Sequence, residues 1–457
     1  MGPLIVHSRN ERTNQQLHYS TDRVIMISDH YHELSSALLG HYLDRDRENA
    51  EPVPDGALIN GRAIRDCDAL PHRRCDNTTS NVGIPSFNFE PNQLHRLRII
   101  NVGAFAEFQF QVDEHELAVT EVDGTDVWPI YYHRLNINPA QRYSVVLNTS
   151  ITTAESFRMR ARMITTCFAE PNSEMVGEVH AIVRHSTDII TEKSDTLPNS
   201  MDWSERQDLE CRDLNTTELV PVEAVAAPEK ADAFFYLRAN FEIGDWQLSR
   251  GVFNTSSWRP NVHSPTLMRA VDGLQAADSS FLTSAQSTSV GTDQVFVNNA
   301  AFDDKRELVI QSSGIQTIDI LIENFDDGNH PFHLHGYKYF VLGQGHGYPP
   351  RKSKFGPMDE DNLAPLYDSL DLSNPLRRDT ASAEAFGWIL IRIVADNPGA
   401  WAFHCHISWH TEAGLLMQFL TRTDLLMDAQ LPTANKALCA GKGLERGMGP
   451  KDEDFYG

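Results

Sequence analysis

Short apolar segments alternate with turn residues along most of this 457-residue chain. Clear examples are 94–101, 142–147, 317–324 and 388–394, where apolar and polar side chains alternate or β-branched side chains predominate. Segments of this kind, bounded by turn residues, are typical of the strands of β-sandwiches. The pattern therefore predicts an all-β fold made of tandem β-sandwich domains.

Residues 186–232 break this pattern. They are rich in Asp, Glu, Ser, Pro and Ala and show no periodicity, so we expect an interdomain linker there. The strand-like segments on either side predict one domain over 16–185 and another over 233–457, the latter including a C-terminal tail. No sequence repeat of roughly 20–50 residues is present, although we expect the two sandwiches to be similar.

Two short blocks near the C-terminus concentrate potential metal ligands. The upstream block reads HPFHLHG from residue 330, and the downstream block reads HCHISWH from residue 404. Together they hold seven candidate ligands: His330, His333, His335, His404, Cys405, His406 and His410. An isolated His is usually a satisfied polar group, but chance does not place both blocks in a chain with 19 His and 6 Cys.

The spacing within the blocks divides the ligands between two faces of a sheet. Successive side chains of a strand point to opposite faces, so Cys405 points away from the two histidines that flank it. One metal can bind on the Cys405 face with His330 and His410. A separate group can bind on the opposite face, where we expect His333, His335, His404 and His406. Zinc also takes Cys and His, but a His₂Cys set with a weak or absent axial ligand is the blue-copper arrangement.

These blocks resemble those of the blue multicopper oxidases, and of the ascomycete laccase-like branch in particular. The segments 374–380 (NPLRRDT) and 395–399 (ADNPG) resemble the same branch. The resemblance implies tandem cupredoxin-like Greek-key domains, with copper as the cofactor. It assigns His330, Cys405 and His410 to a type 1 copper, and His333, His335, His404 and His406 to a trinuclear cluster.

The family pattern also bears on the axial position and on the substrate. The axial position falls on Leu415, which cannot coordinate, whereas nearby Met417 has the wrong offset and is expected to pack within a strand. Asp29 matches the acidic residue that faces the substrate phenol in laccases, where it can accept the released proton as a catalytic group. The alternative interpretation of Asp29 is a carboxylate at a turn or strand end.

The resemblance implies one-electron oxidation of phenolic or aromatic substrates, including pigment or polyketide precursors, coupled through Cys405 to reduction of O₂ to water. Two alternatives stay open. A ferroxidase would need carboxylates near the type 1 site, and the sequence cannot place its candidates, which are Asp326, Asp327, Asp359, Glu360 and Asp361. The other alternative is a copper-binding fragment that does not reduce oxygen.

The fragment alternative follows from the N-terminal residues. Residues 1–15 resemble the end of the family's first domain, and the two HxH pairs of that domain are not in this sequence. We therefore expect a three-domain oxidase whose first domain is largely missing here, with half of the trinuclear histidines. The pair His30 and His32 is the only other HxH, and its place in the family pattern is far from the cluster.

Composition limits the kinds of binding partner and the cellular compartment that we expect for this protein. The net charge of −24 argues against nucleic acid or an anionic membrane as a partner, and no apolar run is long enough to span a membrane. Cys67 and Cys75 could close a local loop, and Cys167 and Cys211 are candidates for a second disulfide. With the sequons at Asn77, Asn148, Asn215 and Asn254, this predicts a secreted glycoprotein whose signal peptide lies outside this sequence. The sequence defines no oligomeric state.

Overall fold

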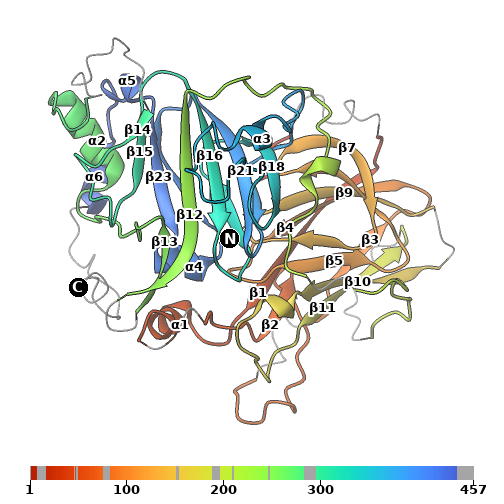
Figure 1. Ribbon diagram of the computed structural model, residues 1–457. Coiled ribbons are helices and arrows are strands. Elements are labelled where there is room, and N and C mark those ends of the chain that lie inside the picture. Colours follow the sequence, from red (N-terminus) through yellow and green to blue (C-terminus); the bar gives the residue numbers. More distant parts are fainter. Residues whose placement is uncertain are drawn as a thin grey trace. The chain divides into compact units, whose positions relative to one another are not determined.

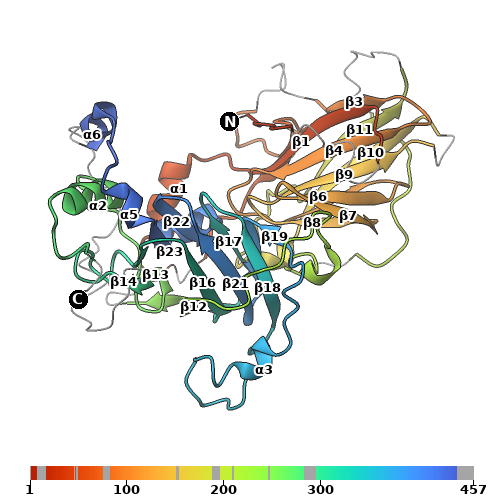
Figure 2. The same cartoon turned by 90° about the horizontal axis from the view of Figure 1, so that it is seen from above.

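The computed structural model describes residues 2–7, 17–45, 47, 50–75, 83–150, 154–187, 196–207, 210–244, 248–282 and 295–439. The chain forms two compact units (Figures 1 and 2). The first unit comprises Met1–Leu34 and Glu51–Ala224, and the second comprises Ser35–Ala50 and Val225–Gly457. Each unit contains two β-sheets, which confirms the all-β prediction.

The first unit has a six-stranded sheet in the order β2-β1-β4-β9-β6-β7 and a five-stranded sheet in the order β3-β11-β10-β5-β8. The strands of the first sheet are β1 (Thr21–His30), β2 (Gly56–Ile59), β4 (Leu94–Asn101), β6 (Leu117–Val122), β7 (Thr125–Tyr132) and β9 (Arg142–Asn148). Those of the second are β3 (Ser86–Phe89), β5 (Phe108–Val112), β8 (Leu135–Ile137), β10 (Ser156–Met163) and β11 (Glu178–His185). Alternate apolar residues of these strands, such as Ile25 and Ile27, are fully buried between the sheets.

The second unit has two six-stranded sheets, in the orders β13-β12-β16-β21-β18-β19 and β14-β15-β23-β22-β17-β20. The first is formed by β12 (Ala233–Ile243), β13 (Ser249–Phe253), β16 (Gln316–Asn324), β18 (Tyr339–His346), β19 (Arg377–Arg378) and β21 (Gly387–Ala395). The second is formed by β14 (Val295–Val297), β15 (Val309–Ser312), β17 (His330–Leu334), β20 (Thr380–Ala383), β22 (Gly399–Cys405) and β23 (Leu416–Thr421). The described helices are short: α1 (Ser35–Tyr42), α2 (Thr266–Gln275), α3 (Ala364–Tyr367), α4 (Ser408–Ala413), α5 (Thr423–Leu426) and α6 (Thr433–Cys439), with 3₁₀ turns η1 (Thr165–Cys167) and η2 (Thr216–Glu218).

The two units share one strand plan although the sequence shows no repeat. In the first unit β1 pairs with β2 antiparallel and with β4 parallel, and in the second β12 pairs with β13 and β16 in the same senses. The central pair β5–β10 of the first unit likewise corresponds to β17–β22 of the second. The expectation of two similar sandwiches is therefore confirmed.

The unit boundaries differ from the predicted 16–185 and 233–457. Residues 35–50 belong to the second unit, where the Tyr42 ring lies 6.1 Å from that of Trp409. The described part of the predicted linker up to Ala224 belongs to the first unit, because it is fixed there by side chains and by backbone pairing. The Arg134 guanidinium, for example, lies 3.1 Å from the Asp202 carboxylate, and Trp128 N–H donates to Val220 O at 2.9 Å.

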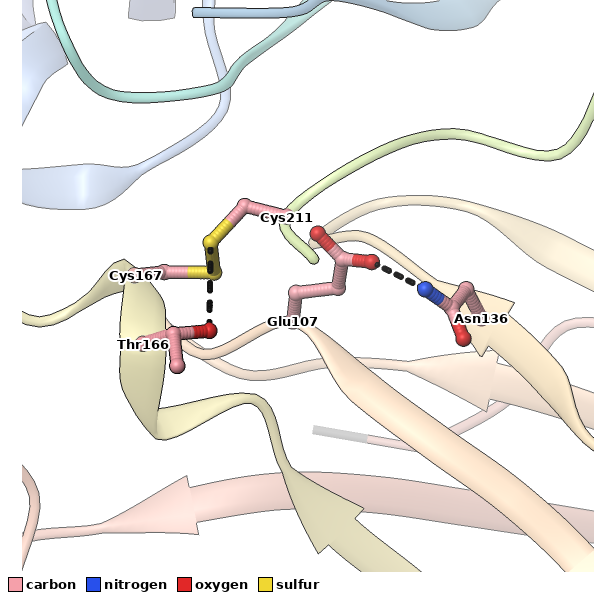
Figure 3. Close-up of a disulfide and its surroundings, with 5 residues drawn as sticks. All are labelled: Glu107, Asn136, Thr166, Cys167 and Cys211. Atoms are coloured by element: carbon pink, nitrogen blue, oxygen red, sulfur yellow. Dashed lines mark hydrogen bonds between the residues drawn. A yellow bond between two sulfur atoms is a disulfide. The ribbon is translucent and has the colours of Figure 1, made fainter. Parts of the chain in front are cut away.

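A disulfide anchors the same segment, and Figure 3 shows its surroundings. Cys167, at the end of η1, is bonded to Cys211, and the Thr166 hydroxyl lies 3.9 Å from the Cys211 sulfur. A second disulfide joins Cys67 to Cys75, so both predicted pairs are confirmed. Among the described helices, none is both long and apolar enough to cross a membrane.

Candidate metal centre

The type 1 ligand set of the second unit comes together at one end of two paired strands. β17 and β22 are antiparallel, with Phe332 opposite Cys405 and His333 opposite His404. Because side chains alternate along each strand, Cys405 shares its face with Phe332 and His330. The chain then turns into α4, which carries His410 back toward Cys405. Gly414 ends this helix at φ 112°, a conformation that favours glycine.

The three ligand atoms form a small triangle inside the protein. His330 Nδ1 lies 3.0 Å from His410 Nδ1, and each nitrogen lies 3.5 Å from Cys405 Sγ. His330 and Cys405 are fully buried, and His410 is 2% exposed. Burial alone would raise the pKa of Cys405, but His410 and His330 outweigh it and lower this pKa to about 7. A thiol that ionises readily beside two imidazole nitrogens is suited to bind copper as a thiolate.

Two further residues lie beside this triangle: Asp326, which the sequence offered as one of five acidic candidates without a position, and Phe241, which it did not indicate. Asp326 Oδ2 lies 3.1 Å from His330 Nε2, the nitrogen that faces away from Cys405. Burial lowers the pKa of His330, but the contacts with Asp326 and Cys405 together outweigh it and raise the pKa overall. The Phe241 ring lies 4.8 Å from that of His410 and 6.0 Å from that of His330. The position of Asp326, four residues before the ligand His330, was the only indication in the sequence that its carboxylate could contact this histidine. No sequence signal pointed to Phe241.

Leu415 and Met417 lie close to the triangle in the chain. Leu415 is fully buried, and its backbone is fixed on both sides, because Cys405 N–H donates to Leu415 O at 3.1 Å and Leu415 N–H donates to His410 O at 2.9 Å. The axial placement of its side chain stays a prediction. Met417 is buried in β23 opposite Phe403, as expected for a packing residue.

The other four histidines gather on the opposite face of the same two strands. His335 Nε2 lies 3.1 Å from His404 Nε2. The His333 ring centroid lies 5.1 Å from that of His335, 5.8 Å from that of His404 and 5.6 Å from that of His406. The predicted separation of the seven ligands into two groups is therefore what the strands produce.

The protonation of these histidines suits metal binding. Burial, followed by the neighbouring imidazoles, lowers the pKa of His404 to about 3, although its contact with the Cys405 carbonyl opposes the shift. Burial and His333 likewise lower the pKa of His406 to about 4. His333 Nδ1 lies 3.0 Å from Asp379 O, and His406 Nδ1 is buried without a hydrogen-bond partner. Neutral nitrogens with free lone pairs are the form that binds copper.

The two groups differ in how completely they surround a metal. In the described part of the chain, the triangle of His330, Cys405 and His410 has all its ligand atoms within 4.8 Å of one another. Among the described residues, no three of the four histidines on the opposite face have ligand atoms that all lie within this distance of one another. The donor set of the triangle thus fits a type 1 copper, whereas the four histidines of the second group are more widely spaced, and their place in a trinuclear cluster stays a prediction.

Asp29 belongs to the first unit, at the end of β1, and is 8% exposed. Its Oδ1 accepts from Ala104 N–H at 2.9 Å, and its Oδ2 accepts from Phe105 N–H at 2.7 Å and Ala106 N–H at 2.8 Å. Burial raises the pKa of Asp29, against the opposing effect of these donors. The carboxylate therefore organises the 103–106 loop, and a role in catalysis stays a prediction.

A β-sandwich that carries a buried His₂Cys triangle on one face of a strand pair and four imidazoles on the other is a copper-binding cupredoxin domain. Family models described as multicopper oxidase match residues 21–185 and 266–424. The chain thus belongs to the multicopper oxidase family, whose members are copper-dependent oxidoreductases.

Relatives of two kinds are similar to this chain. Laccase-1 of Cryptococcus neoformans var. grubii is 28% identical over 450 residues, which cover 96% of this chain and 65% of the relative. The iron transport multicopper oxidase fio1 of Schizosaccharomyces pombe is 28% identical over 444 residues, covering 97% of this chain and 61% of the relative. The chain thus spans less than two thirds of the length of these curated relatives.

Solved structures show the same fold. The crystal structure of Fet3p, described as a multicopper oxidase that functions in iron import, aligns with a TM-score of 0.72 at 22% identity over 94% of this chain and 71% of that one. The laccase from Botrytis aclada aligns with a TM-score of 0.69 at 24% identity, over 92% of this chain and 67% of that one.

Proposed function

We propose that this protein is a laccase-like multicopper oxidase that takes single electrons from electron-rich phenols, such as pigment or polyketide precursors, and passes them to O₂. The observation that carries the proposal is the position of Cys405 between His404 and His406. Copper bound at these ligands supplies the one-electron redox chemistry. The strand alternation directs Cys405 to one group of ligands and its two covalent neighbours to the other.

The residues around Cys405 support a short electron-transfer path between the two faces of the strand pair. His404 Nδ1 lies 2.9 Å from the carbonyl oxygen of Cys405, so a hydrogen bond runs beside the covalent connection. The complete burial of Cys405 and His330 excludes water and keeps reorganisation small. Because the ligand histidines are buried, an electron would enter through groups packed against them, and the partly buried Phe241 ring beside His410 would offer an aromatic contact to the substrate.

A ferroxidase is the second candidate, favoured by the contact of Asp326 with His330. A carboxylate hydrogen-bonded to a type 1 ligand could hold Fe(II) and pass its electron to that ligand. Relatives named for iron transport, such as the iron transport multicopper oxidase FET3 of Candida albicans at 26% identity over 431 residues, support this candidate.

The test uses a version of the protein with its copper sites complete. The ratio of kcat/KM for an electron-rich phenol to kcat/KM for Fe(II) shows whether the protein is a phenol oxidase or a ferroxidase. We expect phenol turnover to dominate and Asp326→Asn to lower Fe(II) oxidation more than phenol oxidation. Efficient Fe(II) oxidation with negligible phenol turnover would reverse the ranking.

For the 457-residue chain by itself, the expected copper content and oxygen uptake are different. Four histidines offer too few donors for three metals, since each metal needs about three or more protein ligands to bind tightly. For this chain alone we therefore propose at most about one tightly bound copper, at the triangle, and no steady oxygen uptake with a phenol. Metal analysis showing close to four coppers per chain, with oxygen uptake, would overturn this.

We also propose that the protein passes through the secretory pathway. Asn215 and Asn254 are exposed sequon residues, and the two disulfides suit an oxidising compartment. The sequon at Asn77 lies outside the described residues. A mobility shift after glycosidase treatment of protein from a secreting host would support this, and unmodified intracellular protein would contradict it.

A further inference from the structure

A second cluster of metal-ligating side chains lies in the first unit, on residues that the copper ligands do not include. A ring nitrogen of His32, a carboxylate oxygen of Asp55 and one of Glu174 all lie within 4.8 Å of one another. We propose that this trio, the His32 cluster, binds one divalent first-row transition ion, with Zn²⁺ as the best match. The proposal is independent of the oxidase function.

The distance between the first two ligands fits a metal better than a hydrogen bond. His32 Nδ1 lies 3.4 Å from Asp55 Oδ2. That is long for a hydrogen bond, whose usual length is about 2.9 Å. Two ligands that each lie about 2.0–2.1 Å from a tetrahedral zinc are roughly 3.3–3.4 Å apart. The two atoms are therefore already separated by the distance expected between two ligands of a tetrahedral zinc ion.

Backbone and side-chain bonds hold the cluster in place before any metal binds. Asp55 directly precedes β2, and its N–H donates to His30 O at 2.9 Å. Asp55 Oδ2 accepts from His32 N–H at 2.7 Å. Asn172 connects the two carboxylate residues, because its Nδ2 donates to Asp55 Oδ1 at 3.2 Å and its Oδ1 accepts from Glu174 N–H at 2.9 Å. A metal would therefore find its ligands positioned at little cost in ordering.

The disulfide loop from Cys67 to Cys75 supports the third ligand. It carries His72, whose Nε2 lies 2.8 Å from Glu174 Oε1, and Arg73, whose Nε donates to Glu174 Oε2 at 3.2 Å. His72 is in the position of an outer partner that orients a ligating carboxylate. The positive charge of Arg73 competes with a cation for the same carboxylate, so it should weaken the site.

The donor types and the exposure define the class of ion. The cluster offers one imidazole and two carboxylates and no sulfur, which suits zinc and its borderline neighbours rather than Cu(I). The side chains of His32 and Glu174 are 27% and 23% exposed, so an ion can enter from solvent and keep a water ligand. His30 lies beside the cluster, with its ring centroid 5.9 Å from that of His32.

Zinc binding to the copper-loaded chain tests the proposal. We expect one Zn²⁺ per chain beyond the copper content, by equilibrium dialysis and metal analysis. The zinc absorption edge should report a shell of nitrogen and oxygen only, at about 2.0–2.2 Å. His32→Ala and Glu174→Gln should each weaken binding by at least about tenfold, since each removes a ligand. Arg73→Gln should tighten binding, because it removes the competing charge.

A matched control comes from the same unit. His133 also lies between two carboxylates, 3.4 Å from Glu116 and 2.9 Å from Glu205, without forming a three-ligand set with them. His133→Ala should leave zinc binding unchanged. Thermal unfolding of each variant without zinc shows whether it is folded, and Glu174→Gln preserves the shape of the side chain if His32→Ala fails. Absence of the extra zinc, equal binding in the variants, or a sulfur neighbour at about 2.3 Å, which would place the zinc on Cys405, would overturn the proposal.

Discussion

Replacing Asp29 with alanine should destabilise the first unit, because the substitution removes the acceptor of three backbone N–H groups. Two of these groups, on Phe105 and Ala106, donate in buried surroundings, and the third, on Ala104, is partly accessible. A hydrogen bond to a charged group contributes about 1.5–3 kcal/mol, and a buried donor left without a partner costs about 1–3 kcal/mol. Since the partly accessible donor can turn to water, we expect a total loss of about 3–6 kcal/mol.

A loss of that size is a large share of the free energy of unfolding of an ordinary domain, which is about 5–15 kcal/mol. It corresponds to a fall in Tm of about 6–24 °C for a unit of this size, at about 2–4 °C per kcal/mol. Asp29→Asn keeps one acceptor oxygen but places an amide donor against the remaining N–H groups, so its loss should be intermediate.

Scanning calorimetry of the copper-loaded protein, with hydrogen exchange of the 103–106 amides, measures the effect. Asp66→Ala serves as the control, because the exposed Asp66 carboxylate accepts from a single backbone N–H, that of Asp68, at 3.0 Å. We expect the control to change stability by less than about 1 kcal/mol. Amide exchange in the loop should accelerate strongly in Asp29→Ala and remain slow in the control.

Kinetics distinguish this structural role from proton acceptance. If Asp29 only organises the loop, Asp29→Ala in the version of the protein with its copper sites complete should affect the oxidation of a phenol and of a non-phenolic reductant equally. An unchanged Tm, together with slower oxidation of the phenol alone at higher pH, would refute the structural reasoning and show that the carboxylate accepts the substrate proton.

Three further predictions concern the metal triangle and the buried histidines. Cys405→Ser should abolish the intense blue absorption of the copper-loaded protein, and a folded, copper-loaded wild type without colour would contradict the type 1 assignment. Leu415→Met should lower the type 1 potential in a redox titration by adding a weak thioether ligand, whereas an unchanged potential would mean that Leu415 is not axial. Burial lowers the pKa of His185 to about 4, and it also lowers the pKa values of His95 and His115 below the ordinary histidine value of about 6.5. Because the folded unit holds these groups neutral while the unfolded chain protonates them, stability should fall as the pH drops from about 6.5 toward 4, and His185→Gln should flatten this acid slope in denaturant melts at stepped pH.

The ligand set could be predicted because a strand has a period of two. That rule alone assigns Cys405 and its neighbours His404 and His406 to opposite faces, and the register of β17 against β22 agrees with it. Asp326 could be named as an acidic candidate but not placed, because its contact with His330 depends on how the turn before β17 folds.

The unit boundaries could not be predicted, for a different physical reason. Composition reports whether a segment has strand-like alternation, but it does not report where an irregular segment packs. The segment around Asp202 has no periodicity, yet ion pairs, backbone pairing and the Cys167–Cys211 disulfide fix it to the first unit. The short helix α1 marks no change of composition, although it belongs with the second unit.

The shared strand plan allows the copper-bearing positions to be compared with their counterparts in the first unit. On β5 and β10, Gln111 pairs with Arg160 and Gln109 pairs with Arg162, on the face that corresponds to His333 and His404. Acidic side chains neutralise these guanidinium groups, as where Arg160 Nε donates to Asp113 Oδ1 at 2.7 Å.

One backbone frame thus accepts either a set of imidazoles or a set of ion pairs on the same face. Metal binding is therefore a property of a few side-chain positions in this molecule, because the first unit has the same strand pairing without the copper ligands. The second unit therefore shows which side chains would have to be introduced into the first unit to build a metal site there. The face of β5 and β10 offers a scaffold on which a second metal centre could be built by side-chain replacement alone, with the second unit supplying the pattern to copy.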